Sequence, residues 1–142
     1  MMKKIDVILL VEDDPITNYI NSRLINKTGI ASEIAVALNG EDALAMIKER
    51  IQNNKGCPEL IFLDINMPVM DGFEFLENFR MLEFPNKEKV VIAMLTTSTH
   101  MKDMDKLGSF SNLEILGKPL NQEKLLAITD KYFNLEGFSK IA

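Results

Sequence analysis

Five short stretches of the chain are apolar enough to form strands inside a sheet. Residues 7–11, 60–63 and 90–95 are nearly continuous runs of Ile, Val, Leu, Phe and Met, which is typical of parallel strands buried on both faces. Residues 30–37 alternate apolar and polar positions, and residues 113–116 form a shorter apolar run. The pattern predicts strands at residues 7–11, 30–37, 60–64, 90–95 and 113–116.

Apolar residues at helical spacing follow each of these strands. Asp14-Pro15 marks the start of the first helix, because Asp caps helix N-termini and Pro suits the first helical position. Ile16, Tyr19 and Ile20 continue the helical spacing, and Gly29 ends it. The fourth pattern is the weakest of the five. The predicted helices cover residues 15–28, 40–51, 73–82, 101–107 and 122–133.

Regular alternation of strands and helices with short connections predicts an α/β fold. Its sheet is parallel and doubly wound, with helices on both faces. In such sheets, ligands bind outside the carboxyl ends of the strands, near the point where the strand order reverses. The residues at those ends are therefore the first candidates for a functional site.

Size and charge narrow the possible functions. The chain has 142 residues, enough for one domain with a core of its own. Its net charge of -5 argues against nonspecific binding to nucleic acid or to an anionic membrane surface. No stretch has the roughly 18 to 20 apolar residues that span a bilayer. The single cysteine, Cys57, allows no internal disulfide, so we expect a reducing, cytoplasmic location.

Polar side chains stand at the carboxyl ends of four predicted strands. Glu12 and Asp13 end the first strand, Asp64 the third, Thr96 the fourth and Lys118 the fifth. Three crowded carboxylates repel one another unless a cation lies between them. A ligand set made only of oxygen atoms selects a hard ion, and Mg²⁺ suits a site with few protein ligands. These strand ends therefore predict a magnesium site with a nearby hydroxyl and ammonium group.

Four motifs carry a resemblance to a known family. They are LLVEDDP at 9–15, LIFLDINMPVMDG at 60–72, AMLTTS at 93–98 and LGKPL at 116–120. Together they resemble the receiver domain of the response regulators of two-component signalling, over residues 4–133. The resemblance implies a flavodoxin-like sheet of five strands in the order 2-1-3-4-5, flanked by five helices. Residues 134–142 would be a short tail, so we expect a stand-alone receiver without an output domain.

The resemblance assigns the chemistry to particular residues. Asp64 would be phosphorylated, Thr96 would hydrogen-bond the attached phosphoryl group, and Lys118 would pair with it. The peptide bond between Lys118 and Pro119 would be cis. The chain would catalyse only its own phosphorylation and dephosphorylation. Its phosphoryl donor would be a sensor histidine kinase or a histidine phosphotransfer protein, and its downstream protein partner is unknown.

The metal ligands implied by the resemblance lie close to Asp64. Asp13 and Asp64 would bind Mg²⁺ directly, Glu12 would bind it through water, and Asn66 would give its backbone carbonyl. The turn residues after Asp64 would curl the chain so that this carbonyl faces the metal. One departure from the family pattern is Ile115, which stands where many members have Tyr or Phe three residues before the lysine.

Two other functions stay open at this point. A phosphohydrolase of the haloacid-dehalogenase type also has a nucleophilic Asp at a strand end, but it needs a second Asp two residues later. That position is Asn66, which cannot titrate. A receiver-like scaffold that binds partners without being phosphorylated is the second alternative. A calcium-binding loop starting at Asp64 is excluded, because Val69 stands at the required Gly and Phe75 at the required Glu.

Overall fold

The computed structural model describes residues 4–65, 67, 69–97 and 112–133. Within them, five strands form one parallel sheet in the order β2-β1-β3-β4-β5. The predicted fold class and strand order are confirmed. In chain order, the elements are β1 (Ile5–Val11), α1 (Pro15–Thr28), β2 (Ala31–Ala37), α2 (Gly40–Gln52), β3 (Leu60–Asp64), α3 (Gly72–Arg80), the 3-10 helix η1 (Lys87–Lys89), β4 (Val91–Thr96), β5 (Leu113–Gly117) and α4 (Gln122–Phe133).

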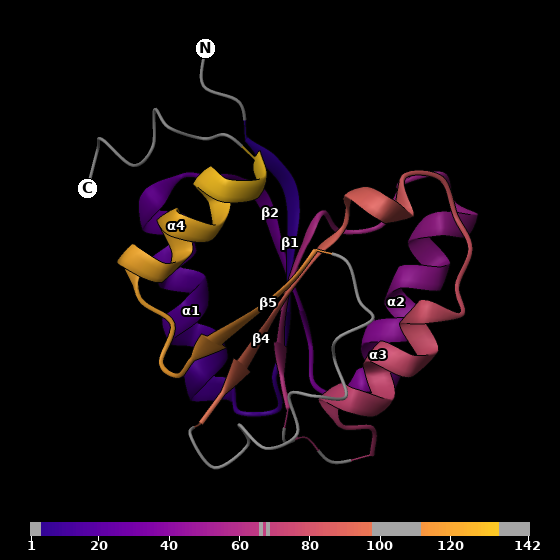
Figure 1. Ribbon diagram of the computed structural model, residues 1–142, viewed down its shortest axis with the longest axis horizontal. Helices are drawn as coiled ribbons and strands as arrows, with labels where there is room; N and C mark the ends of the chain where they lie inside the picture. Colours follow the sequence, from indigo (N-terminus) through magenta and orange to yellow (C-terminus); the bar gives the residue numbers. More distant parts are fainter. Residues whose placement is uncertain (1–3, 66, 68, 98–111, 134–142) are drawn as a thin grey trace.

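Helices cover both faces of the sheet, with α1 and α4 on one side and α2 and α3 on the other (Figure 1). β3 lies in the middle, and all five of its residues are buried. Successive side chains point to opposite faces of a strand. Leu60 and Phe62 accordingly pack in the cluster that includes α4 residues, whereas Ile61 and Leu63 pack in the cluster that includes α2 and α3 residues. Asp64 is the polar residue at the carboxyl end of this apolar strand.

Side-chain caps determine where the helices begin. Asp14 accepts a hydrogen bond from the backbone N–H of Ile16 at 3.3 Å and another from the hydroxyl of Thr17 at 2.6 Å. Pro15 is the first residue of α1. The first contact satisfies one of the backbone N–H groups that the first turn of a helix leaves without an intrahelical partner. Both contacts also fix the path of the chain directly after the acidic end of β1.

The first three apolar residues whose spacing predicts α1 do not lie in the core. Ile16, Tyr19 and Ile20 have exposed fractions of 69%, 64% and 56%. The buried residues of the helix are Asn18, Asn21 and Ile25. α1 therefore turns two amides toward the sheet and leaves an apolar strip at the surface.

The described residues contain four α-helices, one fewer than the five predicted. The predicted helix at residues 101–107 and the predicted tail at residues 134–142 both lie outside them. None of the helices in the described part of the chain combines the length and the hydropathy that crossing a bilayer requires.

Candidate functional site

Three carboxylates meet at the carboxyl ends of β1 and β3. Glu12, Asp13 and Asp64 each offer one oxygen atom, and these atoms all lie within 4.8 Å of one another. Glu12 is 7% exposed and Asp64 4% exposed, whereas Asp13 is exposed. Carboxylates that are this close and partly buried need a cation, a proton or a hydrogen-bond donor between them. The three acids predicted from the strand ends are thus neighbours.

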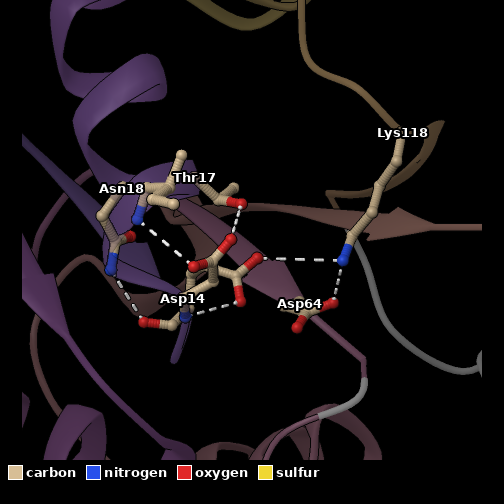
Figure 2. A network of polar contacts seen from close by, with 7 residues as sticks. Asp14, Thr17, Asn18, Asp64 and Lys118 are labelled. Carbon is tan, nitrogen blue, oxygen red and sulfur yellow. Dashed lines mark hydrogen bonds and ion pairs between the residues drawn. The ribbon is translucent and has the colours of Figure 1, made fainter.

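Lys118 supplies one positive charge to this group. Its Nζ lies 2.6 Å from Oδ1 of Asp64 and 3.8 Å from Oε1 of Glu12. Figure 2 shows the side chain extending from its loop to Asp64. The peptide bond between Lys118 and Pro119 is cis, as predicted. The ammonium group is therefore aimed at the acidic cluster from the end of β5.

The environment of the cluster changes the pKa of Glu12. The pKa of Glu12 is raised from 4.5 to about 7, first by burial, then by its hydrogen bond with Asp13 and by the negative charge of Asp64. Lys118 opposes this shift. One ammonium group therefore does not balance three carboxylates, and the donor set fits a small divalent cation that prefers oxygen ligands.

The hydroxyl predicted for the site is at the end of the neighbouring strand. Thr96 is 3% exposed, and β4 pairs with β3 so that Leu95 lies opposite Asp64. The Thr96 hydroxyl donates a hydrogen bond to the carbonyl of Thr97 at 2.9 Å. Asn66, whose backbone carbonyl is predicted to bind Mg²⁺, lies outside the described residues.

A close backbone contact shapes the loop after Asp64. The N–H of Gly72 donates to the carbonyl of Ile65 at 2.9 Å. A Cβ at position 72 would lie 2.9 Å from the carbonyl oxygen of Asp64 and 3.0 Å from Cα of Ile65. Only glycine fits so near a backbone, which explains the Asp71-Gly72 pair in the sequence. Asp71 then caps α3 through a reciprocal pair of hydrogen bonds with Glu74.

Two supporting residues were not identified from the sequence. Asn18 donates from its amide to the carbonyl of Glu12 at 2.9 Å. Lys124 donates from Nζ to the carbonyls of Gly117 at 2.6 Å and Pro119 at 3.1 Å, on either side of Lys118. The sequence gives no signal for either residue. The periodicity of α1 does not tell which of its faces meets the sheet, and Lys124 is one of several lysines in predicted helices.

Comparisons with known proteins agree with this geometry. The family described as "Response regulator receiver domain" matches residues 8–130. The crystal structure of a two-component response regulator from Cytophaga hutchinsonii is 30% identical and has a TM-score of 0.82, covering 93% of this chain and 99% of its own. A two-component response regulator from Legionella pneumophila is 31% identical with a TM-score of 0.74, covering 94% and 99%.

Two of the curated relatives are longer than this chain. Hybrid signal transduction histidine kinase B of Dictyostelium discoideum is 36% identical in an alignment of 133 positions that covers 87% of this chain and 6% of the relative. A probable C4-dicarboxylate response regulator, DctR, of Priestia megaterium is 26% identical, covering 93% of this chain and 54% of its own length. The chain thus spans 6% of the length of the first of these two proteins and 54% of the second. The family model matches residues 8–130, and a response regulator of known structure is 30% identical over 93% of the chain. The chain therefore belongs to the response regulator receiver domains of two-component signalling.

Proposed function

We propose that the chain is a phosphoacceptor that takes a phosphoryl group onto Asp64. The observation that carries this proposal is the setting of Asp64, a buried carboxylate at the end of the central strand, next to Lys118 and two further acids. A carboxylate oxygen of Asp64 attacks the phosphorus of a phosphohistidine. A P–O bond forms and the P–N bond breaks, and the imidazole nitrogen keeps the electron pair of that bond.

The neighbouring groups serve the transferred phosphoryl group. Lys118 leaves its ion pair with Asp64 and pairs with the new phosphoryl oxygens. The Thr96 hydroxyl turns from the Thr97 carbonyl to hydrogen-bond one of these oxygens. Phosphoryl transfer asks little of a protein beyond positioning and charge neutralisation, which these two side chains provide.

The acidic cluster fits Mg²⁺ by its chemistry. Asp13 and Asp64 would hold the ion directly and Glu12 through water, with the backbone carbonyl of Asn66 as a further ligand. When bound, Mg²⁺ supplies positive charge for the phosphoryl oxygens. The support for this assignment is the three carboxylates within 4.8 Å and the raised pKa of Glu12.

The phosphoryl donor follows from the family. Receiver domains take their phosphoryl group from histidine kinases or histidine phosphotransfer proteins, and one relative of this chain is a hybrid histidine kinase. We propose that phosphorylation changes the binding of a downstream protein. The cytoplasmic location stays a prediction from the sequence.

The proposal predicts that Asp64 is the sole acceptor. Acetyl phosphate with Mg²⁺ should add one phosphoryl group, measured by intact mass, and Asp64→Asn should abolish the addition. Asp71→Asn is the matched control, because asparagine also caps a helix and the acid lies in the same loop. A phosphoryl adduct that persists in Asp64→Asn would overturn the assignment. An unmodified wild-type protein would favour the scaffold, and sustained turnover of a phosphate monoester would favour the hydrolase.

A further inference from the structure

The backbone that carries Glu12 and Asp13 is held at several points. The N–H of Glu12 donates to the carbonyl of Ala37 at 3.0 Å, which continues the pairing of β1 with β2. The N–H of Asp14 donates to Oε2 of Glu12 at 3.2 Å. The carbonyl of Glu12 accepts from Nδ2 of Asn18 at 2.9 Å. The amide of Asn18 thus holds the peptide group that joins Glu12 to Asp13.

Packing alone would favour an apolar side chain over an asparagine at position 18. Asn18 is 7% exposed, on the buried face of α1. Its Oδ1 is buried without a hydrogen-bond partner among the described residues. An unpaired buried acceptor lowers the free energy of unfolding, whereas an apolar side chain of similar size would carry no such cost. The hydrogen bond to Glu12 is therefore what distinguishes asparagine from leucine at this position.

The peptide held by Asn18 sets the direction of Asp13. Glu12 and Asp64 are buried and held by packing, but Asp13 is exposed. Rotation of the peptide between Glu12 and Asp13 would turn the Asp13 carboxylate away from the other two acids. Figure 2 shows the Asn18 amide in the same polar network as Asp14 and Thr17, which fix the chain on the other side of Asp13.

We infer that Asn18 is a positioning residue that keeps Asp13 oriented for the cation. The inference rests on the proposed function, because it assumes that the three acids bind Mg²⁺. Groups that orient metal ligands without touching the metal affect affinity strongly, and their loss costs about 10- to 100-fold. Asn18 acts on Asp13 through the backbone of Glu12.

The test separates metal binding from folding. Asn18→Leu should melt at or above the wild-type temperature without Mg²⁺, because the unpaired oxygen is gone. Its affinity for Mg²⁺, from NMR titration of backbone amides with MgCl₂, should fall about tenfold or more. In the metal-free protein, the Asp13 amide should become more mobile in Asn18→Leu. With acetyl phosphate, this variant should need more Mg²⁺ for half-maximal phosphorylation but reach the wild-type maximal rate.

Asn21→Leu is the matched control. Asn21 is a buried asparagine on the same helix, about one turn farther from the acids, and its replacement should leave the Mg²⁺ affinity unchanged. Asn18→Ala is the second variant and should show the same loss of affinity without added bulk.

Wild-type Mg²⁺ affinity in a stable Asn18→Leu would overturn the inference and leave the phosphoacceptor proposal standing. Failure of both Asn18 variants to fold would show that Asn18 is a structural residue and would also overturn the inference. Absence of Mg²⁺ binding in wild type would overturn both the inference and the metal assignment. Normal Mg²⁺ binding without phosphorylation would overturn the phosphoacceptor proposal alone.

Discussion

At the scale of single residues, the pKa of Glu12 reflects its burial and the charges around it. Burial, the hydrogen bond with Asp13 and the charge of Asp64 raise its pKa from 4.5 to about 7. Between these two pH values, the folded protein binds more protons at Glu12 than the unfolded chain does. Its contribution to the free energy of unfolding is fully present below about pH 4.5 and is lost as the pH rises through about 7. Above about pH 7, the ionised Glu12 therefore no longer makes this contribution.

The upward shift of the Glu12 pKa predicts how the stabilisation of the fold by Mg²⁺ depends on pH. Protons and Mg²⁺ compete for the same carboxylates, so saturating Mg²⁺ should raise the melting temperature more at about pH 8 than at about pH 5. Thermal unfolding at both pH values measures the effect. Glu12→Gln should reduce the difference between the two pH values, and Asp13→Asn should remove most of the Mg²⁺ effect. An equal Mg²⁺ shift at both pH values would contradict the shared site.

At the scale of elements, the connection from β3 to α3 depends on close backbone contact at Gly72. We predict that Gly72→Ala lowers the free energy of unfolding by about 1–3 kcal/mol, because the new Cβ would press on backbone atoms of Asp64 and Ile65. Phosphorylation of the folded fraction should also slow, since Asp64 would be displaced. Denaturant unfolding and intact mass measure the two effects.

Gly117→Ala provides the control for this substitution. A Cβ at Gly117 would have one neighbour within 4 Å, Nζ of Lys124 at an ordinary 3.9 Å. Its free energy of unfolding should therefore change much less. Equal losses in the two variants would argue against a special role for the contact at Gly72.

The exposed apolar residues of α1 lead to a prediction about where the protein that donates the phosphoryl group docks. Ile16 and Ile20 are exposed, lie one turn apart and follow the acidic end of β1 closely. A protein that brings a phosphohistidine to Asp64 must approach this edge of the sheet. Ile16→Glu with Ile20→Glu should slow transfer from a phosphorylated histidine phosphotransfer protein by about tenfold or more. Transfer from acetyl phosphate should stay unchanged.

Met81→Glu is the control for the α1 substitutions, because Met81 is an exposed apolar residue just after α3. Its transfer rates from both donors should equal those of wild type. Equal slowing with acetyl phosphate in the α1 variant would indicate damage to the site itself and contradict the docking prediction.

Local signals explain which elements could be predicted from the sequence. The buried strands are apolar runs, and Asp14 is an N-cap whose preference follows from local chemistry. The buried face of α1 could not be predicted, because three apolar residues of its first turns lie outside, whereas two amides lie inside together with Ile25. A hydrophobic pattern identifies a helix but does not tell which of its faces meets the sheet when the buried face is mixed.

At the scale of the whole molecule, the sheet order creates the site. β1 and β4 both pair with β3, so the acidic end of β1 and the end of β4, which carries Thr96, flank the end of β3 from two sides. Lys118 reaches Asp64 from the far side of β4. Hydrophobic periodicity predicts the strands but not their order, which came from the resemblance. The ion pair of Lys118 with Asp64 depends on that order and on the loop held by Lys124.

The most direct test of the account is chemical trapping of the phosphoryl group. After incubation with acetyl phosphate and Mg²⁺, borohydride reduces an aspartyl phosphate to homoserine, and peptide mass spectrometry locates the converted residue. If Asp64 is the phosphorylated residue, homoserine should appear at position 64, dependent on Mg²⁺, with Glu12, Asp13 and Asp71 unchanged. Conversion of another aspartate, or phosphorylated protein without conversion of Asp64, would contradict this assignment.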